Sequence, residues 1–364
     1  MLQESLIHKA LSGIKDPRSG QDLLTAKMIE DLKIVDKQVN FTLVLPSLSA
    51  EYKFELHVAI VQAIQAEYPD AEVNIHMTAR APSANQPSSS VPQIRNIIAV
   101  ASGKGGVGKS TVAVNLALGL KELGARVGLL DADLYGPSMP TMLGLSGERP
   151  QIQEINGKPK IVPLQAYGMP VMSIGFIIEP EQAVVMRGPR LAAIIQQFFN
   201  DVLWDALDYL VVDLPPGTGD IQLTLVQTVP VTGVVMVTTP QDVAVADAIK
   251  AMNMFRMPNV DVPILGVVEN MAWFTPAELP NNKYYIFGEG GGARLAKLSE
   301  SIMLGQIPLV QSIREAGDHG RPSVLREDAI TKKAFLEVAQ NVARQTAARN
   351  ELLAPTRIVK IEHQ

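Results

Sequence analysis

The sequence predicts an α/β protein in which a doubly wound, mostly parallel sheet follows a small α+β domain. A stretch rich in Pro, Ser and Ala, residues 79–94, separates two segments of different pattern. Beyond it, short Val/Ile/Leu runs alternate with longer helical patterns, which is typical of parallel strands covered by helices on both faces. The length of 364 residues is also enough for two domains, at roughly 100–200 residues per domain.

The segment before this linker, residues 1–78, has the pattern of a small α+β domain. Its expected elements are, in order, a helix over 6–14, a turn at 16–20, strands over 29–35 and 39–45, a helix over 51–67 and a strand over 72–77.

The longer segment, residues 95–353, carries the buried strand patterns. Strands are expected at 96–101, 127–131, 209–213, 233–239, 264–269 and 303–307. Because these runs are almost continuously apolar, they indicate strands buried on both faces. Between the second and third run, apolar residues recur at steps of three and four from Leu191 to Leu203, and we interpret this helical face as core. A last helical pattern covers 331–353, and residues 354–364 form a tail.

The first run leads into the strongest motif, which satisfies GxxxxGK[ST] and precedes a helical pattern that ends at Gly124. In this arrangement backbone N–H groups and a helix N-terminus hold phosphates. A glycine-rich turn with a chance Lys-Ser pair is the alternative, which the order of strand, loop and helix disfavours. The predicted ATP-binding residues here are Gly103, Lys104, Gly105, Gly106, Val107, Gly108, Lys109, Ser110 and Thr111. Lys109 would reach the β and γ phosphates, and Ser110 would ligate Mg²⁺.

Lys104 lies inside the same loop, directly after its first glycine. An ordinary P-loop does not constrain this position, so a solvated lysine is the simple interpretation. The functional alternative is an extra cation that stabilises charge on the γ-phosphoryl oxygens, including those of a neighbouring subunit's nucleotide, as an arginine finger does. The loop alone leaves both interpretations open, and a family resemblance carried by further motifs favours the catalytic role.

Three more segments end strand runs, where doubly wound sheets bind their ligands. Asp131 and Asp133 follow the second run, and this spacing suits the positioning of water and contact with Mg²⁺. Asp213 ends the third run, where it would hold Mg²⁺ through water, and precedes a glycine-rich turn that could sense the γ-phosphate. Asn270 follows the fifth run and offers a donor and an acceptor to an adenine edge.

Several motifs in order give a specific resemblance. They are KGGVGKS in the loop, DADLYGPSMP at 131–140, RGP at 187–189, DLPPGTGDIQLT at 213–224, TTPQDVA at 238–244 and ENM at 269–271. Over about residues 95–345 the chain resembles the Mrp/ApbC family of deviant-Walker-A P-loop ATPases, in the MinD/ParA/nitrogenase iron protein group, which are described as iron–sulfur cluster carriers. Residues 1–78 resemble the MIP18-like (DUF59) domain that precedes the ATPase in many bacterial members, through Asp16-Pro17 and Gly20.

The resemblance implies a homodimer that closes over two ATP molecules, with Lys104 acting across the interface. It gives Asp131 and Asp133 the first-switch and water-activating positions, Asp213 the Walker B position and Asn270 the adenine-reading position. The implied activity is slow, Mg²⁺-dependent hydrolysis of ATP to ADP and phosphate. The implied cargo is an iron–sulfur cluster, and the implied partners are apoprotein clients or cluster-assembly proteins.

The chain departs from this family in one respect, because it contains no cysteine. Members that carry a cluster usually have a CxxC a few residues after ENM, and the small domain usually has a cysteine near residues 45–50. Glu278 and Asn281 are the alternative donors after ENM, and their hard oxygens suit iron–sulfur clusters poorly. The five histidines are scattered without ligand spacing. We therefore identify no cluster ligands.

Charge and hydropathy argue against nucleic-acid and membrane partners. The net charge is −5, which lacks the basic excess of a nucleic-acid binder. No apolar run approaches a membrane span and no signal peptide is expected, so the expected location is the cytoplasm. The alternatives are a MinD- or ParA-like organiser, which would need a basic tail or face, a cysteine-free adaptor, and a nucleotide-dependent metal-insertion factor that differs mainly in its cargo.

Overall fold

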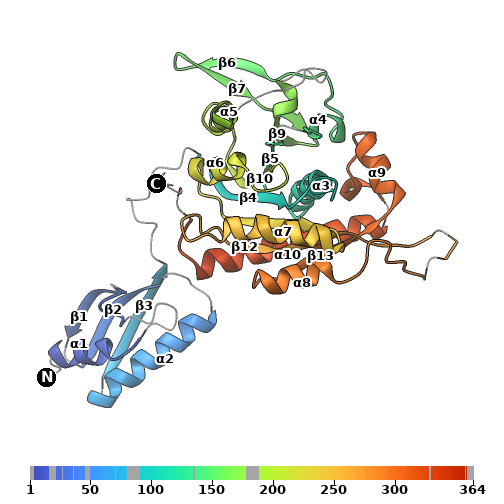
Figure 1. Cartoon of the computed structure of the whole chain (residues 1–364). Coiled ribbons are helices and arrows are strands. Elements are labelled where there is room, and N and C mark those ends of the chain that lie inside the picture. The colour runs from blue at the N-terminus through green and yellow to red at the C-terminus, as the bar shows by residue number, and fades with distance from the viewer. Residues whose placement is uncertain are drawn as a thin grey trace. The chain divides into compact units, whose positions relative to one another are not determined.

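The structure is a computed structural model of the whole chain (Figure 1). It describes residues 4–356 and 358, except 16–21, 27, 36, 46–49, 70, 80–90, 134–135, 178–187, 277, 280, 328 and 357. The predicted turn at 16–20, most of the predicted linker, Arg187 and most of the predicted tail lie outside the described residues. The chain divides into two compact units, residues 1–86 with 348–354 and residues 87–347 with 355–364.

The smaller unit is an α+β sandwich of one sheet and two helices. Its elements are α1 (Glu4–Ser12), β1 (Ile29–Val35), β2 (Gln38–Leu45), α2 (Ala50–Glu67) and β3 (Glu72–Ala79). The strands lie in the order β1-β2-β3, with β2 antiparallel to β1 and parallel to β3. Side chains from both helices and the sheet form a separate apolar core, which includes Ile7, Leu11, Leu43, Leu56 and Ile60. The two helices and three strands expected here are present.

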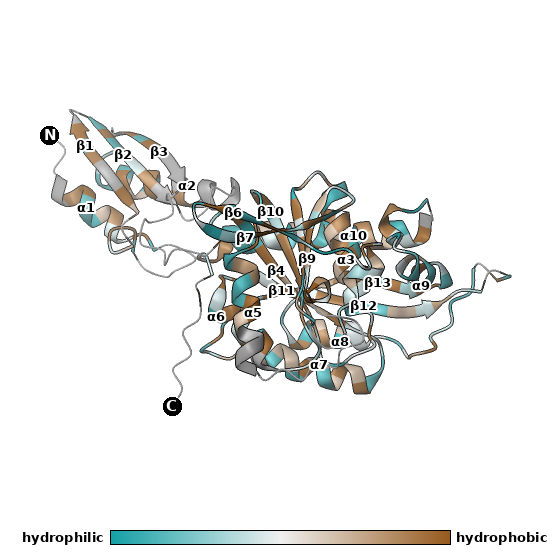
Figure 2. Cartoon of the chain, turned by 90° about the horizontal axis from the view of Figure 1, so that it is seen from above, coloured by the Kyte–Doolittle hydropathy of each residue, from teal (hydrophilic) through white to brown (hydrophobic). Residues whose placement is uncertain are grey.

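The larger unit is built on a sheet of eight strands, in the order β13-β12-β11-β4-β10-β5-β9-β8. Their bounds are β4 (Ile94–Ser102), β5 (Val127–Asp131), β8 (Leu164–Ala166), β9 (Met169–Ser173), β10 (Leu207–Asp213), β11 (Gly233–Thr238), β12 (Ile264–Phe274) and β13 (Met303–Leu309). All neighbouring pairs are parallel except β8 with β9. Every residue of β5 and β11 is buried, and Figure 2 shows the central strands as mostly hydrophobic. The predicted fold class is confirmed.

Helices cover both faces of this sheet. They are α3 (Lys109–Glu122), α4 (Met139–Met142), α5 (Gly188–Asn200), α6 (Asp220–Thr228), α7 (Asp242–Phe255), α8 (Gly291–Leu298), α9 (Gln311–Asp318) and α10 (Ala329–Leu352), with short 3₁₀ turns at Ile174–Phe176 and Ser323–Leu325. The chain moves from β4 to β5 in one direction and from β10 to β11 in the other. Right-handed crossovers therefore place α3 and α6 on opposite faces. Helix α10 packs against α3 where Ala339 meets Gly119.

Sequence reasoning missed four strands between β5 and α5. Strands β6 (Gln151–Ile155) and β7 (Lys158–Val162) form a separate antiparallel hairpin around Asn156 and Gly157, whose φ angles are 53° and 72°. Strands β8 and β9 turn in the same way at Tyr167 and Gly168, with φ angles of 53° and 69°. The Asn-Gly pair is a strong signal for a two-residue hairpin turn. Strand β6 is almost wholly exposed, so it lacks the apolar run that marked the buried strands.

In the described part of the chain, no helix combines the length and the apolar character that a membrane span requires.

Candidate nucleotide site

The glycine-rich loop lies between the end of β4 and the start of α3, at the carboxyl edge of the parallel sheet. Gly106 and Gly108 have backbone φ angles of 81° and 80°, which residues other than glycine rarely adopt. A Cβ on Gly103 would lie 2.1 Å from the backbone nitrogen of Ala248 in α7, and one on Gly108 would lie 2.2 Å from Nδ2 of Asn270. The glycines are therefore required both by backbone conformation and by the close approach of neighbouring elements.

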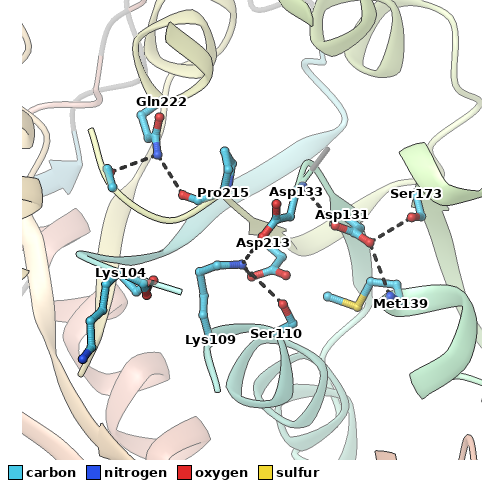
Figure 3. A network of polar contacts seen from close by, with 12 residues as sticks. Lys104, Lys109, Ser110, Asp131, Asp133, Met139, Ser173, Asp213, Pro215 and Gln222 are labelled. Carbon is cyan, nitrogen blue, oxygen red and sulfur yellow. Dashed lines mark hydrogen bonds and ion pairs between the residues drawn. The ribbon is translucent and has the colours of Figure 1, made fainter. Parts of the chain in front are cut away.

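Lys109 is the centre of the polar contacts at this site (Figure 3). Its Nζ lies 2.7 Å from Oδ1 of Asp213, 3.3 Å from Oδ2 of Asp133 and 3.3 Å from Oγ of Ser110. The side chain of Lys109 is only 6% exposed, and that of Asp213 is fully buried. The structure thus brings together four residues that the sequence placed in the site from three separate segments.

The cluster holds more negative than positive charge, because Asp131, Asp133 and Asp213 surround one lysine. Oδ1 of Asp133 and Oδ2 of Asp213 are buried and have no hydrogen-bond partner among the described residues. Burial raises the pKa of Asp213 although Lys109 opposes it. Burial by itself would lower the pKa of Lys109, but Asp213 and Asp133 raise it. A divalent cation would relieve both the excess charge and the unpartnered oxygens.

Asp131 lies deeper than the sequence pattern alone indicated. Its Oδ1 accepts the N–H of Asp133 at 3.0 Å, and its Oδ2 accepts the hydroxyl of Ser173 at 2.9 Å and the N–H of Met139 at 3.4 Å. The side chain of Asp131 is completely buried. In the structure Asp131 therefore fixes the backbone that carries Asp133, and it is Asp133 that faces the lysine.

The position of Asp131 predicts a pH-dependent stability. Burial, with a smaller contribution from Asp213, raises the pKa of Asp131 from 3.8 to about 7. Between these values the folded protein binds more protons than the unfolded chain, so this group favours folding at low pH and the effect is lost as the pH rises through about 7. We expect the nucleotide-free protein to gain thermal stability from about pH 8 to about pH 5 relative to Asp131→Asn, measured by circular dichroism. Parallel curves for the two proteins would contradict this prediction.

Two adjoining cavities open beside the loop. One, of about 450 Å³, is lined by Lys104, Lys109, Ser110, Asp133 and Pro216 among others. The second, of about 520 Å³, is lined by Asn270, Met271 and residues 308–310 among others. Gly108, Thr111, Ser138 and Met142 border both cavities. A phosphate chain beside Lys109 and a base beside Asn270 are thus compatible with one continuous cleft.

Asn270 and Lys104 lie outside the cluster of charged contacts around Lys109. Nδ2 of Asn270 donates to the carbonyl oxygen of Val107 at 2.8 Å, so its amide supports the loop as well as lining the second cavity. The half-buried side chain of Lys104 points away from Lys109 and Asp213 in Figure 3, although it borders the first cavity. Its direction is suited to a group outside this cluster.

Sequence reasoning missed two residues that support the site, Ser173 and Gln222. Ser173 ends β9, the strand that was not expected, and its hydroxyl reaches Asp131. Gln222 lies in the first turn of α6 and bonds to the loop after Asp213. Gln222 falls within the motif at 213–224, and its spacing of three residues after Gly219 is that of a helix capping box, but neither signal indicates its contacts with the loop.

The segment after β12 offers oxygen and aromatic groups in place of thiols. Glu278 and Asn281 are exposed, and Lys283 lies over the ring of Trp273 at 3.9 Å. Across the described ranges, His, Asp and Glu side chains form no group of three or more that could hold a metal ion. The chain has no sulfur donor apart from methionine, because it contains no cysteine. This donor set does not fit an iron–sulfur cluster.

The fold and the site together define a P-loop NTPase: a glycine-rich loop between a buried strand and a helix, with its lysine held by carboxylates at the ends of two neighbouring strands. Residues 93–343 match the family model described as NUBPL iron-transfer P-loop NTPase, and residues 4–75 match the model of an iron–sulfur cluster assembly protein. The chain belongs to this family of iron-transfer P-loop NTPases, with the cluster-assembly type of domain preceding the NTPase.

Curated relatives are similar over nearly the whole chain. The iron–sulfur cluster carrier protein of Synechocystis sp. is 44% identical, with 94% of this chain and 98% of that protein covered. The iron–sulfur cluster carrier protein of Escherichia coli K12 is 39% identical, with 96% and 94% covered. Both comparisons support the predicted resemblance.

Solved structures are similar to the larger part of the chain. A nucleotide-binding protein in complex with ADP from Archaeoglobus fulgidus is 36% identical with a TM-score of 0.58, covering 68% of this chain and 94% of that one. The cell division ATPase MinD of Pyrococcus furiosus has a TM-score of 0.51 at 23% identity, covering 68% and 98%. The second likeness shows the shared fold alone.

Proposed function

We propose that this chain is a Mg²⁺-dependent ATPase that serves as the nucleotide switch in iron–sulfur cluster handling. The observation that carries the ATPase is the buried contact of Lys109 with Asp213 and Asp133, with unpartnered carboxylate oxygens beside a cavity large enough for phosphates. The relative bound to ADP supports the choice of an adenine nucleotide. We place the ATPase domain at residues 95–353 and the small domain at residues 1–78.

Each residue has a role that follows from its position. Lys109 would leave its carboxylates to contact the β and γ phosphates, while the N–H groups of residues 103–111 surround them. Ser110 and, through water, Asp213 would hold Mg²⁺, which neutralises phosphate charge when bound. Two protein groups suffice because Mg²⁺ usually keeps several waters and binds phosphate oxygens. Asp133, whose Oδ1 is free of partners within the described chain, would orient the attacking water and accept its proton.

We propose further that Lys104 completes the site of a second subunit in a homodimer. The direction of its side chain, away from its own Lys109 cluster, supports this role. We expect Lys104→Ala to lower kcat by at least about 10³-fold while ATP binding is kept, because a cation supplied in trans stabilises the transition state. The measurement is single-turnover phosphate release together with ATP titration.

A mixing experiment separates action in trans from action in cis. Lys104→Ala has an intact Asp133 and Asp133→Asn has an intact Lys104, so a mixed dimer contains one complete site if Lys104 acts in trans and none if it acts in cis. If Lys104 acts in trans, the mixture recovers about a quarter of wild-type turnover, given random pairing. A mixture no more active than the sum of the separate variants would assign Lys104 to its own subunit. Light scattering in ATP against ADP tests the dimer itself.

The absence of cysteine favours an adaptor form of the family's role, in which an apoprotein or assembly partner supplies the thiolates. After anaerobic reconstitution with iron and sulfide, we expect the purified chain to retain neither in stoichiometric amount, because its oxygen donors suit a cluster poorly. Iron and acid-labile sulfide analysis is the measurement. A stoichiometric cluster that passes to an apoprotein would overturn the adaptor form and leave the ATPase untouched.

A further inference from the structure

One side chain holds the loop between β10 and α6, residues 214–219. The amide of Gln222 is buried, with 1% of the residue exposed. Its Oε1 accepts the N–H of Gly219 at 2.9 Å, and its Nε2 donates to the carbonyl oxygens of Pro215 at 2.8 Å and Gly217 at 3.0 Å. Figure 3 shows the contact of Gln222 with Pro215. The two ends of the loop and its middle are therefore tied to a single group.

The amide of Gln222 uses both of its N–H donors and its oxygen acceptor in these contacts. A primary amide has two N–H donors and one oxygen acceptor, and here both donors meet carbonyl oxygens while the acceptor meets an N–H. A carboxylate of the same shape could accept from Gly219 but could not donate to Pro215 or Gly217. An apolar side chain of similar length could do neither.

The loop in turn forms part of the phosphate cavity. It starts directly after Asp213, and Pro216 lines the cavity beside Lys109. Gly217 has a φ of 89°, and its N–H donates to the carbonyl oxygen of Ser102 at 2.8 Å, where β4 ends and the glycine-rich loop begins. Gln222 thus fixes a wall of the cavity and, through Gly217, joins it to the phosphate-binding loop.

The contact with Gly219 alone would be an ordinary helix cap, since a glutamine at the third helical position commonly accepts from the N-cap N–H. The contacts with Pro215 and Gly217 are additional, because a cap needs no donor to the preceding loop. They fix the loop on the side of Asp213, so their loss would move cavity-lining atoms as well as weaken the start of α6.

We propose that Gln222 is a positioning residue for phosphoryl transfer. Gln222 is not among the residues that line the cavity beside Lys109, and it acts through the loop 214–219, which it holds in the form that would meet the γ-phosphate and the attacking water. This proposal rests on the proposed ATPase function. Gln222→Glu keeps the shape of the side chain and the acceptor for Gly219 but removes both donors and places a carboxylate against two carbonyl oxygens.

The test compares kcat and KM for ATP in Gln222→Glu, Gln222→Met and the control Gln227→Glu, a half-buried glutamine on the same helix. We expect kcat to fall about 10–100-fold in both Gln222 variants, because a misplacement near 1 Å can cost that much. KM is expected to change less than about threefold, because the contacts of Lys109 and the glycine-rich loop with the nucleotide remain.

Several outcomes overturn the proposal. It fails if the wild-type chain hydrolyses ATP and both folded Gln222 variants keep wild-type kcat, or if KM rises while kcat is unchanged. It also fails if Gln227→Glu lowers kcat equally. If Gln222→Glu does not fold, Gln222→Met decides alone, with folding checked by thermal unfolding. Absence of hydrolysis in the wild type would instead refute the proposed ATPase function, so the two failures are distinguishable.

Discussion

Replacing Lys109 with alanine is expected to lower ATP turnover by at least about 10³-fold, because the variant loses the cation that would neutralise the transferred phosphoryl group in a buried site. Lys109 is also the partner of two carboxylates, at 2.7 Å for Asp213 and 3.3 Å for Asp133. Loss of the lysine therefore leaves like charges facing each other where the phosphates would bind, and we expect weaker ATP binding as well as slower hydrolysis. Phosphate release and ATP titration measure the two effects.

The matched control is Lys333→Ala, which removes an exposed lysine from α10. Breaking a buried ion pair can itself cost about 3–5 kcal/mol of stability, so thermal unfolding must accompany the kinetics. A folded Lys109→Ala protein with wild-type turnover would remove Lys109 from the site.

Asp213→Asn is expected to have the second large effect. The substitution keeps the shape of the side chain but removes the charge that would hold the water on Mg²⁺, and it weakens the 2.7 Å contact with Lys109 because a neutral amide oxygen replaces a carboxylate. We expect the Mg²⁺ requirement to rise about 10–100-fold, the usual loss when an outer group of a metal site is removed. Turnover at low Mg²⁺ would then fall strongly and would recover in part when Mg²⁺ is raised.

Mg²⁺ titrations of ATP hydrolysis test this prediction, with Asp205→Asn as the control at an exposed aspartate that precedes the same strand. An unchanged Mg²⁺ dependence in Asp213→Asn would show that the metal is held elsewhere. A loss of turnover that added Mg²⁺ does not relieve would assign Asp213 chiefly to the placement of Lys109.

The buried strands of the sheet were predictable because each is a short, nearly continuous apolar run between helical patterns. Every residue of β5 and β11 is buried, so almost every position in these strands requires an apolar side chain. The hairpin of β6 and β7 was not predicted because many of its side chains are exposed and form no apolar run. The sequence feature that indicates a hairpin there is the Asn156-Gly157 turn. Strands β8 and β9 are short, and β8 alone in the sheet is antiparallel to its neighbour.

Some residues of the site were also predictable from local sequence patterns, whereas others depend on how distant elements pack. The glycine-rich loop and the aspartates at strand ends are local patterns, and parallel pairing of β10 with β4 and β5 brings them together. The sequence could not reveal that Asp131 is enclosed by Ser173 and Met139, since these contacts depend on where β9 and α4 pack. Gln222 is similar, because its contacts depend on the conformation of the loop before α6.

The chain contains no cysteine, and the described residues form no group of three or more His, Asp or Glu side chains that could hold a metal ion. The strand that carries Asn270 continues to Phe274, and the segment beyond it presents Leu279, Tyr284 and Ile286 to solvent. These groups offer no soft donors. The motifs of the nucleotide site are present, while the segment after β12 has no thiol to offer a cluster.

Single-turnover hydrolysis by the wild-type chain is the most direct measurement of the proposed ATPase. Protein in excess over ATP labelled at the γ-phosphate would be incubated with Mg²⁺, and phosphate release followed with time. We predict release of the labelled phosphate that stops when Mg²⁺ is chelated. Tight binding of Mg²⁺-ATP by a folded dimer without any phosphate release would contradict the assignment of Lys109, Asp133 and Asp213 to a hydrolytic site.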